Sequence, residues 1–243
     1  MSNAAKARLF VPAALSGGAE VVLPSDQAHY LRHVLRLGEG DVVALFNGRD
    51  GEFHAVLAAV GKKDVRLQVG MQTRPFAMAA DLWLCFAPIR QGRIEMVIEK
   101  ATELGVGRLL PVQTRRCQIP KVNGERLSAI AREAAEQSER LDVPPVENLV
   151  TLEKLLAEWP SGRRLYVCAE RSEALPLLAA VQPRPKDEPC ALLIGPEGGF
   201  APEELGTILR HPAIVPVTLG QNILRAETAA IAALAILQAG RQN

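Results

Sequence analysis

Short apolar runs that alternate with amphipathic segments from residue 82 onward constrain the fold of this chain most strongly. Residues 82–86, 109–112, 165–169, 191–195 and 214–219 form runs without a single charge, as strands do when both faces of a sheet are covered. Between the first two runs, apolar residues recur at positions 94, 97, 98, 101 and 104, and Gly105 follows them. This spacing predicts a helix that ends at a glycine. The pattern as a whole predicts an α/β domain with a parallel sheet.

The preceding part of the chain has a β pattern. Residues 8–11, 42–46, 52–57 and 64–69 predict strands, residues 25–37 predict one helix, and the Gly48 and Gly51 turn positions predict a hairpin. This arrangement indicates a small β-barrel or sandwich. Because the pattern changes near Pro75, we expect two domains, at residues 1–75 and 76–243.

Charge and cysteine usage exclude several classes of protein. The chain has 28 Lys and Arg residues against 27 Asp and Glu residues, so only local basic clusters would attract a nucleic acid. The four cysteines, at positions 85, 117, 168 and 190, form no C-x-x-C pair, which argues against a zinc site or a disulfide framework. There is no signal peptide and no apolar stretch of about 20 residues. We therefore expect a reduced cytoplasmic protein without a metal or a membrane span.

A glycine-rich loop, residues 195–200, directly follows the apolar run at 191–195. Ligands of open α/β sheets bind at the carboxyl ends of strands, where glycines allow close approach to the backbone. The loop matches no nucleotide-phosphate motif, and Glu197 would repel a pyrophosphate. S-adenosylmethionine, which carries a positive centre and no phosphate, suits it better. Taken alone, the pattern fits a simple tight turn equally well.

A second polar loop, residues 220–225, leads into an apolar helix predicted for residues 226–239. Arg225 and Glu227 are the charged pair at this junction. They are candidates for catalysis, although Glu227 could instead complement the helix N-terminus while Arg225 forms a surface ion pair.

Taken together, residues 194–200 and 219–229 resemble the paired knot motifs of the SPOUT methyltransferases, specifically the bacterial family that methylates N3 of a uridine in 16S ribosomal RNA. Residues 8–11, 29–36, 100–106 and 133–138 extend the likeness along most of the chain. The resemblance implies an N-terminal PUA-like RNA-binding β-barrel and a C-terminal SPOUT α/β domain with a deep trefoil knot. It also implies S-adenosylmethionine as cofactor, a homodimer, and 16S rRNA within the assembled small subunit as substrate.

The resemblance and the charge pattern assign the candidate site residues. The cofactor would bind to Ala169, Ile194, Gly195, Pro196, Glu197, Gly198, Gly199, Leu219, Gly220, Ile223 and Leu224. Arg225 would stabilise the uridylate charge, while Glu197 or Glu227 would orient the cofactor or take part in proton removal. RNA would contact Arg8, Arg32, Arg36, Arg90, Arg93, Arg115 and Arg116. Two alternatives stay open, namely methylation of another RNA nucleotide and a non-catalytic RNA-binding factor for ribosome assembly.

Overall fold

The computed structural model describes residues 4–61, 64–168, 174–182, 185 and 188–242. The chain divides into two compact units. Unit 1 comprises Met1–Met78 and Ala135–Val143, and unit 2 comprises Ala79–Ala134 and Pro144–Asn243. The return of residues 135–143 to unit 1 is a long-range feature that the local sequence pattern does not predict.

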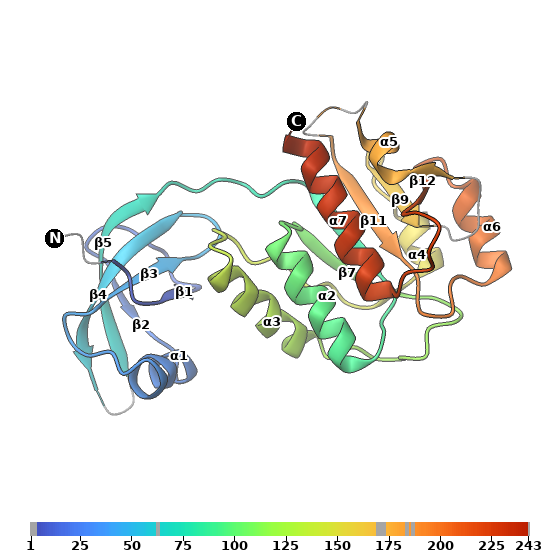
Figure 1. Ribbon diagram of the computed structural model, residues 1–243. Coiled ribbons are helices and arrows are strands. Elements are labelled where there is room, and N and C mark those ends of the chain that lie inside the picture. The colour runs from blue at the N-terminus through green and yellow to red at the C-terminus, as the bar shows by residue number, and fades with distance from the viewer. Residues whose placement is uncertain (1–3, 62–63, 169–173, 183–184, 186–187, 243) are drawn as a thin grey trace. The chain divides into compact units, whose positions relative to one another are not determined.

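Unit 1 is built on a curled five-stranded sheet (Figure 1). Its strands are β1 (Arg8–Phe10), β2 (Glu20–Val22), β3 (Val42–Phe46), β4 (Glu52–Val60) and β5 (Val65–Arg74). They pair in the order β1-β3-β4-β5-β2, with β1 parallel to β3 and the other pairs antiparallel. Because β1 and β2 are the edges over the described residues, the sheet is a half-barrel. Its concave side packs on a core that includes Leu31, Leu45 and Leu67.

The helical segment of unit 1 differs from its prediction. The expected helix over residues 25–37 is a short helix α1 (Ser25–His29) that continues as a π-helix η1 (Tyr30–Val34). Arg36 then adopts a φ of 57°, in the left-handed region, where a helix cannot continue. The wider hydrogen-bond spacing of η1 has no signature in the apolar periodicity, which is why the sequence indicated one regular helix.

The predicted hairpin joins β3 to β4, and both of its glycines have positive φ, 79° at Gly48 and 89° at Gly51. Gly51 also lies against backbone, because a Cβ there would be 2.3 Å from the carbonyl oxygen of Arg74 and 2.8 Å from the amide nitrogen of Phe76. A Cβ at Gly48 would meet nothing closer than 3.8 Å, at Asp142. Both positions therefore have a left-handed backbone conformation, but only Gly51 lacks room for a side chain.

We expect Gly51→Ala to destabilise unit 1 by about 1–3 kcal/mol more than Gly48→Ala. Both variants strain a positive φ, but only Gly51→Ala also forces backbone apart. Hydrogen exchange of the β4 and β5 amides in the full-length protein measures the difference, since it reports local stability. Equal protection in the two variants would contradict the close packing at Gly51.

Unit 2 is built on a seven-stranded sheet in which every pair is parallel. Its strands are β6 (Leu82–Phe86), β7 (Arg108–Gln113), β8 (Val150–Thr151), β9 (Arg164–Cys168), β10 (Leu175–Pro176), β11 (Cys190–Ile194) and β12 (Ile214–Thr218). The order is β10-β12-β9-β11-β6-β7-β8. Every residue of β11 is buried, in keeping with its uninterrupted apolar sequence.

The helices of unit 2 are α2 (Gln91–Glu103), α3 (Gly124–Gln137, whose last residues belong to unit 1), α4 (Leu152–Ala157), α5 (Leu177–Val181), α6 (Pro202–Arg210) and α7 (Ala226–Gln242). Figure 1 shows α2 and α7 side by side, and α7 packs on β11. No described helix combines the length and the apolar character needed to cross a membrane. The α/β class predicted from the sequence is confirmed, while β8, β10, α4 and α5 are short elements that its periodicity did not reveal.

Candidate active site

The two loops predicted to bind the cofactor follow strands that are neighbours of β9. β11 and β12 both pair with β9, and because the sheet is parallel, the loops at 195–201 and 219–225 leave the same edge. Ile194 is the buried last residue of β11 and Leu219 is the half-buried residue after β12. Ala169, the remaining expected contact, lies outside the described residues.

The glycine loop after β11 depends on having no side chain at two of its positions. A Cβ at Gly195 would lie 3.1 Å from the ring of Phe200. Gly199 has a φ of 64° and donates its amide to the carbonyl of Pro196 at 2.8 Å. The loop is therefore a tight turn, and Glu197 and Gly198 at its tip are exposed.

The loop after β7 fastens the glycine loop in place. The Arg116 guanidinium donates to the carbonyl oxygen of Gly198 at 2.8 Å, and its aliphatic part lies against the same glycine. The buried Glu204 carboxylate accepts the amide of Arg115 at 2.6 Å and the amide of Ala201 at 3.0 Å. Glu204 thus satisfies backbone donors from two loops at the start of α6. It was not among the predicted site residues, since its partner Arg115 is 89 positions away.

The loop before α7 is more open than the glycine loop. Gly220 has a φ of 122° and donates its amide to Thr218 Oγ1 at 3.2 Å. Ile223 is exposed and Leu224 is half-buried. The Arg225 guanidinium is exposed, and within the described part of the chain it has no hydrogen-bond or ion-pair partner. Arg225 therefore presents an uncommitted positive charge at this loop.

A three-membered charge cluster joins the glycine loop to the start of α7 through α2. Arg93 Nη1 lies 3.7 Å from Glu197 Oε1, and Arg93 Nε lies 3.6 Å from Glu227 Oε1. Glu227 is only 9% exposed, and its Oε2 is buried without a hydrogen-bond partner among the described residues. The structure thus brings Glu197 and Glu227 together, and it places Arg93 between them.

The remaining predicted RNA contacts fall into two groups. Arg115 and Arg116 are exposed beside the glycine loop, and Arg90 is exposed at the start of α2. In unit 1, Arg36 is exposed and Arg32 is half-buried, while the side chain of Arg8 is 12% exposed. Arg8 forms an ion pair with Glu52 and donates to two carbonyl groups. These bonds use the donors of Arg8 inside the unit, and its contact with RNA stays a prediction.

Cys85 and the groove at the opposite end of the sheet lie outside the candidate site. Cys85 is buried, and burial raises the pKa of its thiol to about 12, which keeps it protonated. A groove of about 470 Å³ is lined by Trp83, Arg108 and Trp159, near the amino ends of the strands rather than at the glycine loop. No group of His, Cys, Asp and Glu among the described residues has an arrangement that would hold a metal ion.

Two protein-family models match the chain. Residues 77–238 match the family described as an RNA methyltransferase domain. Residues 23–70 match the family described as an RNA methyltransferase PUA domain.

Relatives match over almost the full length. The Ribosomal RNA small subunit methyltransferase E of Rickettsia conorii is 36% identical and the alignment covers 94% of this chain and 93% of that protein. The protein of the same name from Bacillus subtilis is 28% identical, with 88% of each covered.

Solved structures agree with these relatives. The crystal structure of the Neisseria gonorrhoeae protein of that name, bound to S-adenosyl methionine, has a TM-score of 0.86 and 29% identity over 96% of this chain and 97% of its own. The putative methyltransferase Lpg2936 of Legionella pneumophila, also in complex with S-adenosyl methionine, has a TM-score of 0.84 and 32% identity, with 96% of each chain covered.

Proposed function

Because this chain belongs to the ribosomal RNA small subunit methyltransferase E family, we propose that it methylates N3 of a uridine in 16S ribosomal RNA. Its substrate is an RNA and its methyl donor is S-adenosylmethionine. The observation that carries the proposal is the meeting of Glu197, Glu227 and Arg93 at the edge where the two predicted loops leave the sheet. The reaction removes a proton from the base and leaves a negative charge on it. A carboxylate can accept the proton, and a nearby cation can stabilise the charge.

The residues of the two loops fit S-adenosylmethionine. The glycine loop presents backbone at Gly195, Gly198 and Gly199 and an exposed carboxylate at Glu197. A carboxylate suits a sulfonium cation and would disfavour a phosphate. We propose that Ile194–Gly199 hold the cofactor together with Leu219, Gly220, Ile223 and Leu224, and with Ala169 after β9. When bound, the cofactor supplies an electrophilic methyl group.

The side chains of the site act on the base. Neutral N3 of uridine is a poor nucleophile, so the N3–H bond must break before the nitrogen bonds to the methyl carbon, while the sulfur keeps the electrons of the broken sulfur–methyl bond. We assign proton removal to Glu227, whose Oε2 has no partner in the described structure. Arg225 stabilises the negative charge that develops on the base, and Glu197 orients the cofactor. Holding both reactants in place supplies much of the rate enhancement, on the order of 7–11 kcal/mol.

The wider organisation follows from the same family membership. We propose that Arg90, Arg115 and Arg116 contact RNA phosphates near the site and that Arg32 and Arg36 do so from the PUA-like part.

We further propose that residues 1–75 and 76–243 are the two domains, that unit 2 contains a deep trefoil knot, and that the active form is a homodimer. The partly uncovered small-residue face of α7, which includes Ala235 and Ala239, supports dimer formation. A substrate within the assembled small subunit places the protein in the cytoplasm.

We expect the purified protein to bind S-adenosylmethionine and to transfer one methyl group to small subunits that lack this modification. Calorimetry measures cofactor binding, and mass spectrometry of the digested RNA identifies the methylated atom. N3 lies on the pairing edge and must be presented unpaired, so we expect assembled subunits to be methylated faster than isolated 16S RNA. Methylation of another nucleotide would contradict the assigned specificity. A protein that binds the RNA but not the cofactor would instead be a non-catalytic factor.

A further inference from the structure

Arg93 links α2 to the glycine loop and to the first turn of α7. It is the third residue of α2, and its guanidinium faces carboxylates from two other segments, Glu197 in the glycine loop and Glu227 at the second position of α7. The side chain of Arg93 is 35% exposed and that of Glu227 is 11% exposed. Glu227 is thus largely shielded from water, so its pairing with Arg93 is screened less than an exposed ion pair is.

Glu227 is held by one oxygen only. Its Oε1 faces Arg93, and its Oε2 is buried with no hydrogen-bond partner among the described residues. A buried carboxylate oxygen without a partner is unfavourable, and a catalytic role is one of the reasons for which native proteins retain such groups. The start of α7 favours the negative charge, because helix N-termini carry a partial positive charge. Neither the burial of Oε2 nor the helix N-terminus fixes the direction of Oε2. The ion pair at Oε1 is the contact that can do so.

We infer that Arg93 is a positioning residue that acts through Glu227. It holds Oε1 and thereby fixes the direction of the buried Oε2, which would accept the N3 proton once the base binds beside it. This inference rests on the proposed methyl transfer, and it replaces the expectation that Arg93 contacts RNA phosphates. It predicts an effect of Arg93 on the reaction step rather than on RNA affinity.

The experiment compares Arg93→Met with Lys100→Met, a matched control on the same helix. Lys100 also lies between two carboxylates, Glu99 at 2.7 Å and Glu103 at 2.8 Å, but both belong to α2 and neither is part of the site. We expect Arg93→Met to lower kcat for small subunits about tenfold or more, with KM changed less than threefold, while Lys100→Met changes neither. Arg93→Lys, which keeps the charge, should recover part of kcat.

A double-mutant comparison separates action through Glu227 from an independent role. If Arg93 acts only through Glu227, then adding Arg93→Met to Glu227→Gln should lower kcat no further. Effects that multiply in the double variant would overturn the inference, and so would a rise in KM alone, which indicates a phosphate contact. Should Arg93→Met fold poorly, Arg93→Gln provides the same comparison.

Measuring the affinity for S-adenosylmethionine separates the test of the role of Arg93 from the test of the proposed methyl transfer. Calorimetry should give the Arg93→Met variant a Kd for S-adenosylmethionine within about threefold of the wild-type value, since the inference assigns Arg93 to the base and not to the cofactor. Loss of cofactor binding in this variant alone would overturn the inference. Absence of methyl transfer by the wild-type protein would instead reject the proposed function.

Discussion

Arg225→Ala should lower kcat for methyl transfer by about 10²–10³-fold while leaving the affinity for S-adenosylmethionine nearly unchanged. Removal of one group that stabilises charge in a transition state has an effect of about this size. Arg225 precedes α7 and is exposed, and within the described residues no carboxylate neutralises it. Its charge is therefore available to a substrate anion. Single-turnover rates with saturating small subunits measure the chemical step, and calorimetry measures the cofactor.

Arg210→Ala is the matched control for this prediction. Arg210 is another exposed arginine of unit 2, at the end of α6, and it has no role in the proposed site. The control should react at the wild-type rate, which separates a local effect from a general loss of positive charge. A rate within threefold of wild type for Arg225→Ala would contradict the assigned role, and a rise in KM without a change in kcat would make Arg225 an RNA-binding residue.

The parallel sheet could be predicted because its signal is local. β11 is buried along its whole length and carries no charged residue, and the apolar runs 82–86 and 165–168 in the neighbouring strands carry none either. Glycine or polar residues follow β11 and β12. Gly48 and Gly51 similarly predicted the hairpin, because glycine tolerates the positive φ that such turns need. These local signals explain why the fold class could be predicted, whereas the family, also confirmed, was predicted from the motifs at 194–200 and 219–229. Elements of two to six residues, such as β8 and α4, have too few positions to establish a period.

The roles of individual arginines could not be predicted, because they depend on partners far away in the sequence. Arg93 and Glu227 are separated by most of unit 2, and Arg116 meets Gly198 from 82 positions away. The sequence alone does not distinguish between the basic residues Arg8, Arg93 and Arg116, and it predicted an RNA contact for each of them. In the folded chain Arg8 pairs with Glu52, Arg93 faces two carboxylates, and Arg116 holds a loop.

Arg8 is the part of unit 1 that ties three segments together. Its Nε lies 2.6 Å from Glu52 Oε2, its guanidinium stacks on the Phe46 ring at 4.1 Å, and its Nη atoms donate to the carbonyl oxygens of Ala135 and Arg140. Glu52 accepts a further hydrogen bond from Thr73 at 3.0 Å. Burial by itself raises the pKa of Glu52, but the hydrogen bonds from Arg8 and Thr73, with the charges of Arg8 and Arg74, outweigh it and hold the pKa below its ordinary value.

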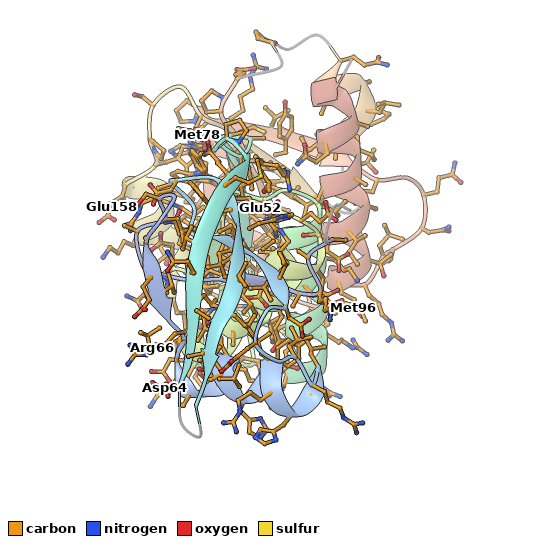
Figure 2. All side chains as sticks on the ribbon, turned by 90° about the vertical axis from the view of Figure 1, so that its left-hand side faces the viewer. Glu52, Asp64, Arg66, Met78, Met96 and Glu158 are labelled. Atoms are coloured by element: carbon orange, nitrogen blue, oxygen red, sulfur yellow. The ribbon has the colours of Figure 1, made fainter. Side chains whose placement is uncertain are left out.

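Arg8→Met should therefore destabilise unit 1 by about 3–5 kcal/mol, the range for a buried ion pair that loses one partner. The matched control is Arg66→Met, because Arg66 on β5 pairs with Glu20 at 3.3 Å and Asp64 at 3.7 Å but is half-exposed, and such pairs contribute at most about 1 kcal/mol. Figure 2 labels both sites, with Arg66 and Asp64 together at one end of the sheet and Glu52 away from them.

Hydrogen exchange of the β1 and β3 amides is the suitable measurement for Arg8→Met, since the two tryptophans, Trp83 and Trp159, lie in unit 2 and their fluorescence does not follow unit 1. A carboxyl whose folded pKa is depressed stabilises the fold above its unfolded pKa, and this contribution disappears as the pH falls through the folded pKa. The difference between wild type and Arg8→Met should thus be full at neutral pH and shrink below the ordinary glutamate range. A difference under 1 kcal/mol at pH 7, equal to that of Arg66→Met, would show that the ion pair of Arg8 contributes no more than an exposed pair and would favour an RNA-binding role for Arg8.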